Sequence, residues 1–312
     1  MGIVKAICIS ECRGTQKHCI DKADFTIDWG ITGDAHGGKW HRQISLLSFE
    51  KTEEFRSRGA EIDFGAFGEN LVVEGFDFRN LPVGTRFQCN DVVLEMTQIG
   101  KECHTHCQIY HKMGDCIMPR EGVFAKVISA GTICVGDELR MLEPKNRPFQ
   151  TAVITLSDKG FKGEREDKSG PLLASILEEQ GYEVVESLIL PDEQSRIERE
   201  LIRLSDGRQL DLILTTGGTG LSLRDVTPEA TLAVATRNVP GIAEVIRAYS
   251  MEITKRAMLS RGVSVLRNRT LIINLPGSPK AVKESMDVIL SELEHGLKIL
   301  KGSASECARQ ME

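Results

Sequence analysis

The chain has 312 residues with a formal net charge of −6, and 41% of its residues are hydrophobic. This length is typical of about two domains, and the ordinary composition excludes a fully disordered chain. The acidic balance excludes a chain-wide basic field, and an aromatic content of 5% is low for base-stacking platforms, so we expect no nucleic-acid partner.

The sequence carries no export or membrane signal that we recognise. No apolar stretch reaches the ~20 residues of a membrane span, and the N-terminus lacks the apolar core of a signal peptide. We therefore expect a cytoplasmic protein without a membrane partner. The odd number of cysteines, nine, argues against a disulfide framework. We expect small buried thiols at Cys8, Cys19, Cys89 and Cys134.

Short β-prone stretches dominate the first half of the chain. The apolar run 3–9 comes first, and further pieces follow at 71–74, 86–89, 92–96, 124–129 and 132–135. Turn residues at 89–91 and at Ala130-Gly131 separate neighbouring pieces, and the one good helix candidate spans 49–58. Short strands punctuated by glycine predict a mainly-β barrel or sandwich.

The densest cysteine and histidine cluster is the run Cys-His-Thr-His-Cys at 103–107, followed by His111 and Cys116. One interpretation is a zinc site, because Cys and His are zinc ligands, although the spacing differs from that of most structural zinc sites. A second is a reactive or sulfur-carrying thiol, activated by the neighbouring histidines and Lys101. A third is a packed core without chemistry.

Residues 143–148 contain two prolines and no apolar side chain, which is typical of a linker. We therefore predict a first domain over 1–143, a linker over 144–150 and a second domain over 151–312.

Strands and helices alternate after the linker. We predict strands at 152–156, 184–190, 210–215 and 271–275, and helices at 171–180, 194–204, 241–255 and 280–300. The last helix carries apolar residues at steps of three and four, as a core-facing helix does. This alternation predicts an α/β domain with a mostly parallel sheet, helices on both faces, and ligands at the carboxyl ends of the strands.

Polar, glycine-rich or acidic loops follow the predicted strands of the second half. Ser157-Asp158 follows the first strand, Asp192 the second, and the run 215–225, which contains Gly-Gly-Thr-Gly, the third. A glycine loop lets backbone N–H groups approach phosphate closely, and Asp192 and Asp225 are then placed to hold Mg²⁺ on the phosphates. A tight turn with helix-capping aspartates explains the same spacing equally well. Arg224 is either an additional charge for the phosphates or a solvated surface arginine.

Residues 151–302 resemble the Mog-type molybdopterin adenylyltransferases. The resemblance rests on Ser157-Asp158, the loop 190–193, the run 215–231 and Asn274-Leu275-Pro276-Gly277. It implies that the domain activates molybdopterin with Mg-ATP, releases pyrophosphate and forms a homotrimer. The two functional aspartates of the family map onto Asp192 and Asp225, which would bind Mg²⁺. The nucleotide-binding and molybdopterin-binding residues would be Ser157, Asp158, Gly217, Gly218, Thr219, Gly220, Ser222, Pro276, Gly277 and Ser278.

Residues 1–143 resemble a MOSC domain, the module found at the C-terminus of molybdenum-cofactor sulfurases. The motifs that carry the resemblance are Gly-Asp-Ala-His-Gly-Gly at 33–38, then 42–47, 67–71, 83–85, and 127–131 leading to 135–137. The resemblance implies a β-rich barrel that binds the molybdenum cofactor, or a sulfurated form of it, with the help of a cysteine.

Cys103 stands where that cysteine is expected, and Cys107 and Cys116 are its rivals. Arg120 would bind the cofactor phosphate or make an ordinary salt bridge. No pyridoxal-phosphate desulfurase domain fits in this chain, so any sulfur would come from elsewhere.

The sequence therefore predicts an enzyme of molybdenum cofactor biosynthesis. The second domain would adenylylate molybdopterin, and the first would bind, sulfurate or carry the cofactor. The expected partners are molybdopterin and ATP, a molybdenum-insertion enzyme or molybdoenzyme clients, and further copies of the chain in a homotrimer built through the second domain. Two alternatives stand beside this hypothesis: a non-catalytic cofactor carrier or chaperone, and a zinc-stabilised interaction module.

Overall fold

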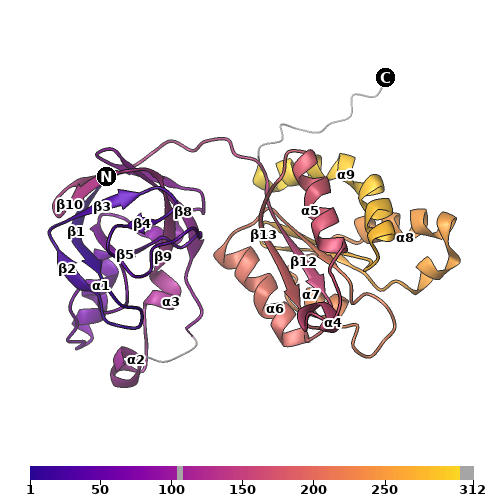
Figure 1. Cartoon of the computed structure of the whole chain (residues 1–312), viewed down its shortest axis with the longest axis horizontal. Helices are drawn as coiled ribbons and strands as arrows, with labels where there is room; N and C mark the ends of the chain where they lie inside the picture. Colours follow the sequence, from indigo (N-terminus) through magenta and orange to yellow (C-terminus); the bar gives the residue numbers. More distant parts are fainter. Residues whose placement is uncertain (104–107, 303–312) are drawn as a thin grey trace. The chain divides into compact units, whose positions relative to one another are not determined.

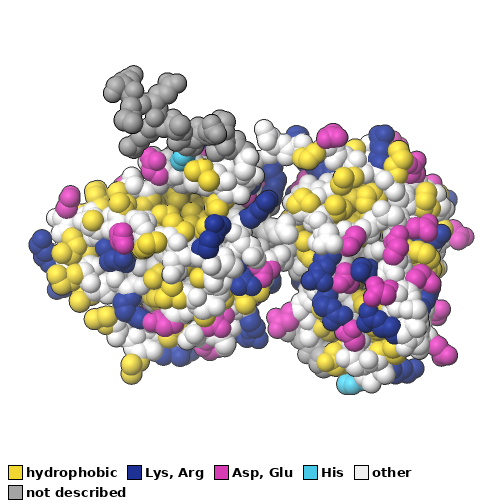
Figure 2. Space-filling view, turned by 180° about the vertical axis from the view of Figure 1, so that it is seen from behind, with side chains coloured by type: hydrophobic (Ala, Val, Ile, Leu, Met, Phe, Trp, Pro, Cys, Tyr) yellow, Lys and Arg dark blue, Asp and Glu magenta, His cyan; other side chains and the backbone are white. Residues whose placement is uncertain are grey.

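The computed structural model describes residues 1–103 and 108–302, and the chain forms two compact units, Met1–Asn146 and Arg147–Glu312 (Figure 1). The predicted linker, 144–150, spans this boundary. Among the described residues, no helix is long and apolar enough to cross a membrane. Basic and acidic side chains are interspersed over both units on the face shown in Figure 2.

The first unit is a closed barrel. Within the described residues, seven strands follow one another around it in the order β11-β7-β8-β9-β5-β6-β1, and β1 pairs again with β11. These strands are β1 (Gly2–Ile9), β5 (Ile44–Ser48), β6 (Leu71–Glu74), β7 (Arg86–Cys89), β8 (Val92–Ile99), β9 (Val123–Ser129) and β11 (Glu138–Met141). Closure leaves the ring without an exposed edge and encloses apolar side chains from every strand. The barrel alternative of the sequence prediction is therefore confirmed.

Smaller elements surround the barrel. Strand β2 (His18–Ile20) pairs with β1, and a second sheet contains β10 (Gly131–Cys134), β3 (Lys22–Thr26) and β4 (Gly30–Ile31). The helical segments are α1 (Phe49–Ser57), η1 (Phe78–Asn80), α2 (Gln108–Met113) and α3 (Met118–Glu121). The predicted hairpin at 89–91 joins β7 to β8, with Asn90 at φ 52°, which a tight hairpin turn requires.

The second unit contains a six-stranded mixed sheet, in the order β13-β12-β14-β17-β16-β15, among the described residues. Strands β13 (Glu183–Leu190), β12 (Gln150–Leu156), β14 (Leu212–Thr216) and β17 (Thr270–Leu275) run parallel to one another. Strands β16 (Ser264–Arg267) and β15 (Arg237–Asn238), which the sequence analysis did not predict, extend one edge antiparallel. The turn between β16 and β17 uses Asn268-Arg269, which is a weaker turn signal than Asn-Gly.

Helices cover both faces of this sheet (Figure 1). Side chains of α5 (Ser169–Glu179), α8 (Pro240–Ile253) and α9 (Pro279–Lys301) pack on one face, with Val153 of β12. Side chains of α6 (Gln194–Ile202) and α7 (Thr227–Ala233) pack on the other, with Ala152 and Ile154. The alternation along β12 reflects the two-residue period of a strand buried on both sides. The remaining short helical segments are α4 (Asp158–Phe161), η2 (Arg203–Gly207) and η3 (Lys255–Leu259).

Candidate functional site

Two of the predicted acidic residues lie against each other where β12 and β13 end. The backbone N–H of Asp158 donates to Asp192 Oδ2 at 3.0 Å, and the backbone N–H of Asp192 donates to Asp158 Oδ1 at 3.1 Å. The two strands are parallel neighbours, so their carboxyl ends meet at one edge of the sheet. This reciprocal pair fixes the position of Asp192 relative to the end of β12.

The glycine loop after β14 passes directly beside Asp192. Gly217 and Gly218 adopt φ values of 100° and 63°, which favour glycine. A Cβ on Gly217 would overlap the Leu156 carbonyl oxygen. A Cβ on Gly218 would overlap the Thr227 hydroxyl and lie 3.1 Å from Asp192 Oδ1. The chain can turn this tightly only because both positions lack a side chain.

Hydrogen bonds from threonine side chains hold the glycine loop in place. The Thr227 hydroxyl donates to the Gly217 carbonyl oxygen at 3.0 Å, and the Thr216 hydroxyl donates to the Pro276 carbonyl oxygen at 2.8 Å. The glycine loop is therefore joined to the loop that follows β17, as expected for neighbouring parallel strands.

A cavity of about 620 Å³ opens beside these loops, within the size range of small-molecule sites. Its lining includes five of the predicted binding residues: Ser157, Gly217, Gly218, Gly277 and Ser278. The segment 165–168, which the sequence analysis did not single out, lines it too. Within that segment, Asp167 accepts hydrogen bonds from the Ser169 N–H and the Thr155 hydroxyl.

Both predicted serines of this cavity also cap helices. The Ser157 hydroxyl oxygen accepts from the Gly160 N–H at 3.0 Å at the start of α4. The Ser278 hydroxyl oxygen accepts from the Ala281 N–H at 3.2 Å at the start of α9. Each hydroxyl proton remains available for a second bond, because a hydroxyl both donates and accepts.

Asp225 folds back onto its own turn, just after the glycine loop. Its Oδ2 accepts from the Ser222 N–H at 2.9 Å and would lie 2.9 Å from a Cβ on Gly220. The Ser222 hydroxyl oxygen in turn accepts from the Arg224 N–H at 3.2 Å. The tight turn therefore contains three predicted residues, Gly220, Ser222 and Asp225.

The electrostatics of the acidic group favour a cation at Asp192. Burial raises the pKa of Asp192 above its ordinary 3.8, and the nearby charges of Asp158 and Asp225 raise it further. Its Oδ1 is buried and has no hydrogen-bond partner among the described residues. The unpartnered Asp192 Oδ1 is an oxygen donor of the kind that a hard divalent cation prefers, although the three aspartates are not arranged as a group of three metal ligands. Because Mg²⁺ is usually held by one or two carboxylates together with substrate phosphates, Asp192 and Asp225 fit such an ion.

Arg224 pairs with Asp158 in a two-pronged geometry. Its Nε donates to Asp158 Oδ2 at 2.9 Å and its Nη2 to Oδ1 at 2.7 Å. This hydrogen bonding lowers the pKa of Asp158. Arg224 thus orients the carboxylate that orients Asp192, a role that neither sequence interpretation of Arg224 included.

Arg261 is a structural residue of the site that the sequence analysis missed. Its guanidinium donates to the carbonyl oxygens of Gly220, at 2.7 Å, and of Asp225, and it pairs with Glu229. Its backbone N–H donates to the Thr219 carbonyl oxygen at 2.9 Å. No local sequence signal identifies it, because it lies about forty positions after the loop that it holds.

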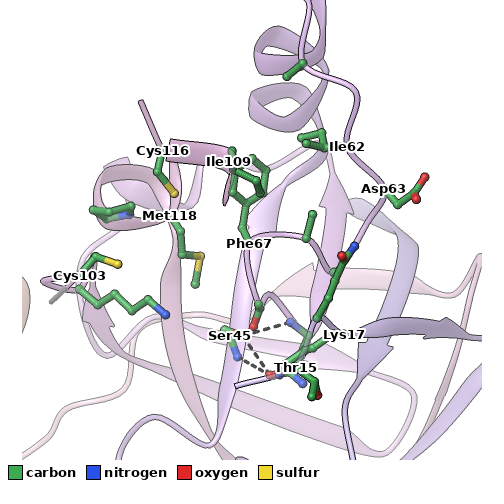
Figure 3. Close-up of a pocket in the computed structure, with 18 of the residues that line it drawn as sticks. Thr15, Lys17, Ser45, Ile62, Asp63, Phe67, Cys103, Ile109, Cys116 and Met118 are labelled. Atoms are coloured by element: carbon green, nitrogen blue, oxygen red, sulfur yellow. Dashed lines mark hydrogen bonds between the residues drawn. The ribbon is translucent and has the colours of Figure 1, made fainter. Parts of the chain in front are cut away.

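A larger cavity of about 1250 Å³ opens in the first unit (Figure 3). Cys103 and Cys116 line it, and Figure 3 shows both thiols on the side opposite Lys17. The cationic or titratable basic side chains in the lining are Lys17, His36, Arg42, Lys101, His111 and Lys112; the acidic ones are Glu61 and Asp63. Because Asp34 neutralises Lys17, the lysines and arginine that add positive charge to the lining are Arg42, Lys101 and Lys112, a small excess over the two acids that favours an anionic ligand.

A buried ion pair underlies this cavity. Lys17 Nζ lies 3.1 Å from Asp34 Oδ2, and the two side chains are 3% and 1% exposed. Asp34 also accepts from the Ser10 N–H and the Asn70 amide, each at 3.1 Å. Burial alone would raise the pKa of Asp34, but the Lys17 charge and these hydrogen bonds lower it.

The hydrogen bonds around Asp34 bring three separate sequence motifs into contact. Asn70 accepts from the Ser45 N–H at 3.1 Å, so the motifs 33–38, 42–47 and 67–71 meet at one point. Lys17 itself was missed by the sequence analysis, because a single lysine in a polar segment carries no signal for burial.

The other sequence predictions in the first unit have mixed outcomes. Arg120 forms a two-pronged ion pair with Asp115, at 2.8 and 2.9 Å. Cys107 lies outside the described residues. No group of three or more potential metal-ligating side chains is found within residues 1–103 and 108–302.

The prediction of buried thiols is correct for Cys8 and Cys89 and wrong for Cys19 and Cys134, which are exposed. The two exposed cysteines lie on short peripheral strands, β2 and β10, outside the closed ring. Residue type alone does not distinguish such strands from those of the barrel.

Comparisons with known proteins agree with both resemblances. Residues 33–140 match the family described as "MOSC domain", and residues 152–295 match the family described as "Probable molybdopterin binding domain". The molybdopterin adenylyltransferase of Helicobacter pylori is 39% identical over 153 residues, which are 48% of this chain and 87% of that relative. The molybdopterin adenylyltransferase of Escherichia coli is 44% identical over 142 residues, 45% of this chain and 72% of that relative.

Among solved structures, the molybdopterin biosynthesis enzyme MoaB of Thermus thermophilus is similar, with 46% identity and a TM-score of 0.48, over 49% of this chain and 97% of that chain. The predicted fusion of two modules is confirmed by the family matches. The chain therefore belongs to the molybdopterin adenylyltransferase family of nucleotidyltransferases, and it joins that module to a MOSC domain.

Proposed function

We propose that the second unit transfers the adenylyl group of ATP to the terminal phosphate of molybdopterin. A phosphate oxygen of molybdopterin forms a bond to the α-phosphorus of ATP, and the bond to the β-phosphate breaks, releasing pyrophosphate. The observation that carries this proposal is Asp192, with its buried unpartnered oxygen beside the Gly218 turn and near Asp225. The names of the relatives support the substrates.

The reaction brings two anions together, so the protein must offset their repulsion and align them. The turn at Gly217 and Gly218 lets phosphate approach the backbone closely, and no covalent intermediate is needed. Mg²⁺ bound by Asp192 and Asp225 would supply positive charge to the phosphates. Arg224 and Asp158 position Asp192, and Arg261 holds the turn that carries Asp225.

The role proposed for the first unit is binding of molybdenum cofactor or a sulfurated form of it. The basic lining of the larger cavity supports an anionic pterin phosphate, and Cys103 and Cys116 are the candidate sulfur ligands within the described residues. A molybdenum-insertion enzyme or a molybdoenzyme would receive the cofactor. We place the protein in the cytoplasm.

A homotrimer built through the second unit is also part of the proposal. Large apolar side chains are exposed there, including Leu221, Leu223, Met258 and Leu259. Leu223 is 98% exposed, which is costly for a leucine that stays in water. Measurement of the molar mass in solution tests this assembly.

Incubation of the purified protein with molybdopterin and Mg-ATP tests the activity. We expect adenylylated molybdopterin by mass spectrometry and one pyrophosphate released for each product. A matched reaction with the non-hydrolysable α,β-methylene analogue of ATP should give neither. Binding of molybdopterin without pyrophosphate release would favour the carrier alternative.

Variants at the two thiols that line the larger cavity test the role proposed for the first unit. Cys103→Ser should abolish thiol-dependent cofactor binding, and Cys116→Ser should reduce it only mildly, with metal content unchanged in both. Equal losses accompanied by loss of bound zinc would favour the zinc-stabilised module instead. Undiminished binding by Cys103→Ser would move the role to another residue.

A further inference from the structure

Two cysteines outside both cavities face each other across neighbouring strands. Cys8 of β1 and Cys19 of β2 are directly opposite in the antiparallel register. Their sulfur atoms lie 3.5 Å apart, and both are free thiols. Neither residue belongs to a motif on which the proposed function depends.

The backbone geometry at this pair permits a disulfide. The Cys8 N–H donates to the backbone carbonyl oxygen of Asn70 at 2.7 Å, and the Cys8 carbonyl oxygen accepts from the side-chain amide of Asn70 at 3.0 Å. Both backbone groups of Cys8 therefore point away from β2, so Cys8 and Cys19 form a non-hydrogen-bonded pair. Such pairs have Cα atoms about 4.5 Å apart, inside the range of roughly 4.4 to 6.8 Å that disulfides accept.

The two thiols differ in their access to solvent. Cys8 is fully buried, whereas Cys19 is exposed. Burial raises the pKa of the Cys8 thiol, and the neighbouring Cys19 raises it further. Cys19 is therefore the thiol that meets a dissolved reagent, and Cys8 is the protected thiol behind it.

We propose that Cys8 and Cys19 are an oxidant-sensitive pair that forms a reversible disulfide when the protein meets a hydroperoxide. The Cys19 thiolate attacks the peroxide oxygen, giving a sulfenic acid and water. The Cys8 sulfur then displaces the sulfenic hydroxyl group, which leaves as water with the proton of Cys8. In sum, two thiols lose two electrons and two protons, and one hydrogen peroxide is reduced to two waters; a dithiol reverses the bond by exchange.

The Cys8–Cys19 pair lies outside the larger cavity but contacts a residue next to its wall. Disulfide formation would therefore also change a contact near the cavity. The Cys19 thiol donates to the Phe64 carbonyl oxygen at 3.8 Å, and the disulfide would remove that donor. Gly65, the next residue, lines the cavity and packs against the Lys17 backbone. The disulfide would thus change one restraint on the cavity wall.

Peptide mapping of the full-length protein tests the proposal. The reduced protein is treated with hydrogen peroxide, the remaining thiols are alkylated, and trypsin then places Cys8 and Cys12 together in residues 6–13 and Cys19 in residues 18–22. We expect these two peptides joined, at a mass lower by two hydrogens than their sum, and separated again by dithiothreitol. Recovery of Cys8 as an alkylated thiol, with Cys19 held as a stable sulfenic acid, would overturn the proposal.

Cys12 is the rival partner, because it is exposed and shares a peptide with Cys8. Cys12→Ser should leave the two peptides joined by the disulfide, and loss of this link in that variant would overturn the proposal. Cys19→Ser should remove the link without disturbing the core, because Cys19 is exposed. Cys8→Ala should also remove it and leave Cys19 trapped as a sulfenic acid by dimedone. A link that persists in Cys8→Ala would equally overturn it, because Cys12 would then be the partner of Cys19.

Discussion

At the scale of single residues, Asp192 and Asp225 should have the largest effects on catalysis. We expect Asp192→Ala and Asp225→Ala each to lower pyrophosphate release ~10²-fold or more, because each removes a preorganised ligand of the charge-neutralising ion. Asp287→Asn is the matched control, since that carboxylate is exposed on α9 and pairs only with Lys283 in the described structure. Near-normal release by both alanine variants, with folding intact, would refute the assignment.

The raised pKa of Asp192 predicts a pH dependence that Mg²⁺ should modify. A raised pKa means that the carboxyl group keeps its proton to a higher pH than an ordinary aspartate, and the protonated form cannot hold a cation. Activity at limiting Mg²⁺ should therefore fall as the pH is lowered, and saturating Mg²⁺ should move this fall to lower pH. Pyrophosphate release measured against pH at the two concentrations checks this, and superimposable profiles would contradict it.

Removal of one partner of the buried Lys17–Asp34 pair should be strongly destabilising. Asp34→Asn leaves the Lys17 charge unpaired in the interior, which typically costs about 3–5 kcal/mol. Urea unfolding of the first unit measures the change. The control, Glu74→Gln at the half-exposed Lys5–Glu74 pair, should cost at most about 1 kcal/mol.

The same pair has a predictable acid response. Because the pKa of Asp34 is lowered in the folded state, its contribution is fully present above the unfolded value of 3.8 and is lost as the pH falls through the folded value. The difference in stability between the native protein and Asp34→Asn should therefore shrink at acid pH. A difference that stays constant there would contradict the assignment.

At the scale of elements, the glycine loop after β14 should tolerate no side chain at its second position. Gly218→Ala would be strained by φ 63° and would push against the Thr227 hydroxyl and Asp192. Gly163→Ala is a matched control, because Gly163 has φ 73° but a Cβ there would meet no neighbouring atom within 4 Å. We expect Gly218→Ala to lower activity by at least about 10-fold, the effect of misplacing a binding group, while Gly163→Ala keeps it. Equal activities in the two variants would show that the loop is not part of the site.

At the scale of the whole molecule, the second unit should fold and act alone. This compact unit begins at Arg147. Near its start, the ring of Phe149 packs on that of Tyr182, with the ring centroids 5.9 Å apart. We expect a fragment of residues 147–312 to be soluble and to keep adenylyltransferase activity. A fragment starting at Thr151 should melt at a lower temperature, because it loses the Phe149 contact. An inactive 147–312 fragment would indicate that the first unit completes the site.

Local sequence patterns were enough to predict the two modules, the β-rich and α/β character of the halves, and the acidic and glycine loops. These features are local: strand and helix periods, turn residues and loop motifs are encoded within a few positions of one another. The prediction of the helix at 49–58 and the hairpin at 89–91 succeeded for this reason.

The distant residues that support those loops could be identified only in the folded chain. Arg261 reaches back to the loop at 219–225, and Lys17 is buried against Asp34 because strands far apart in the sequence close the barrel. Local sequence patterns likewise predicted neither the exposure of Cys19 nor the strand β16, because burial and strand order depend on pairing between distant segments. Short sequence motifs thus supply the functional groups of the sites, whereas the geometry and electrostatics of the sites arise from contacts that form only when the chain folds.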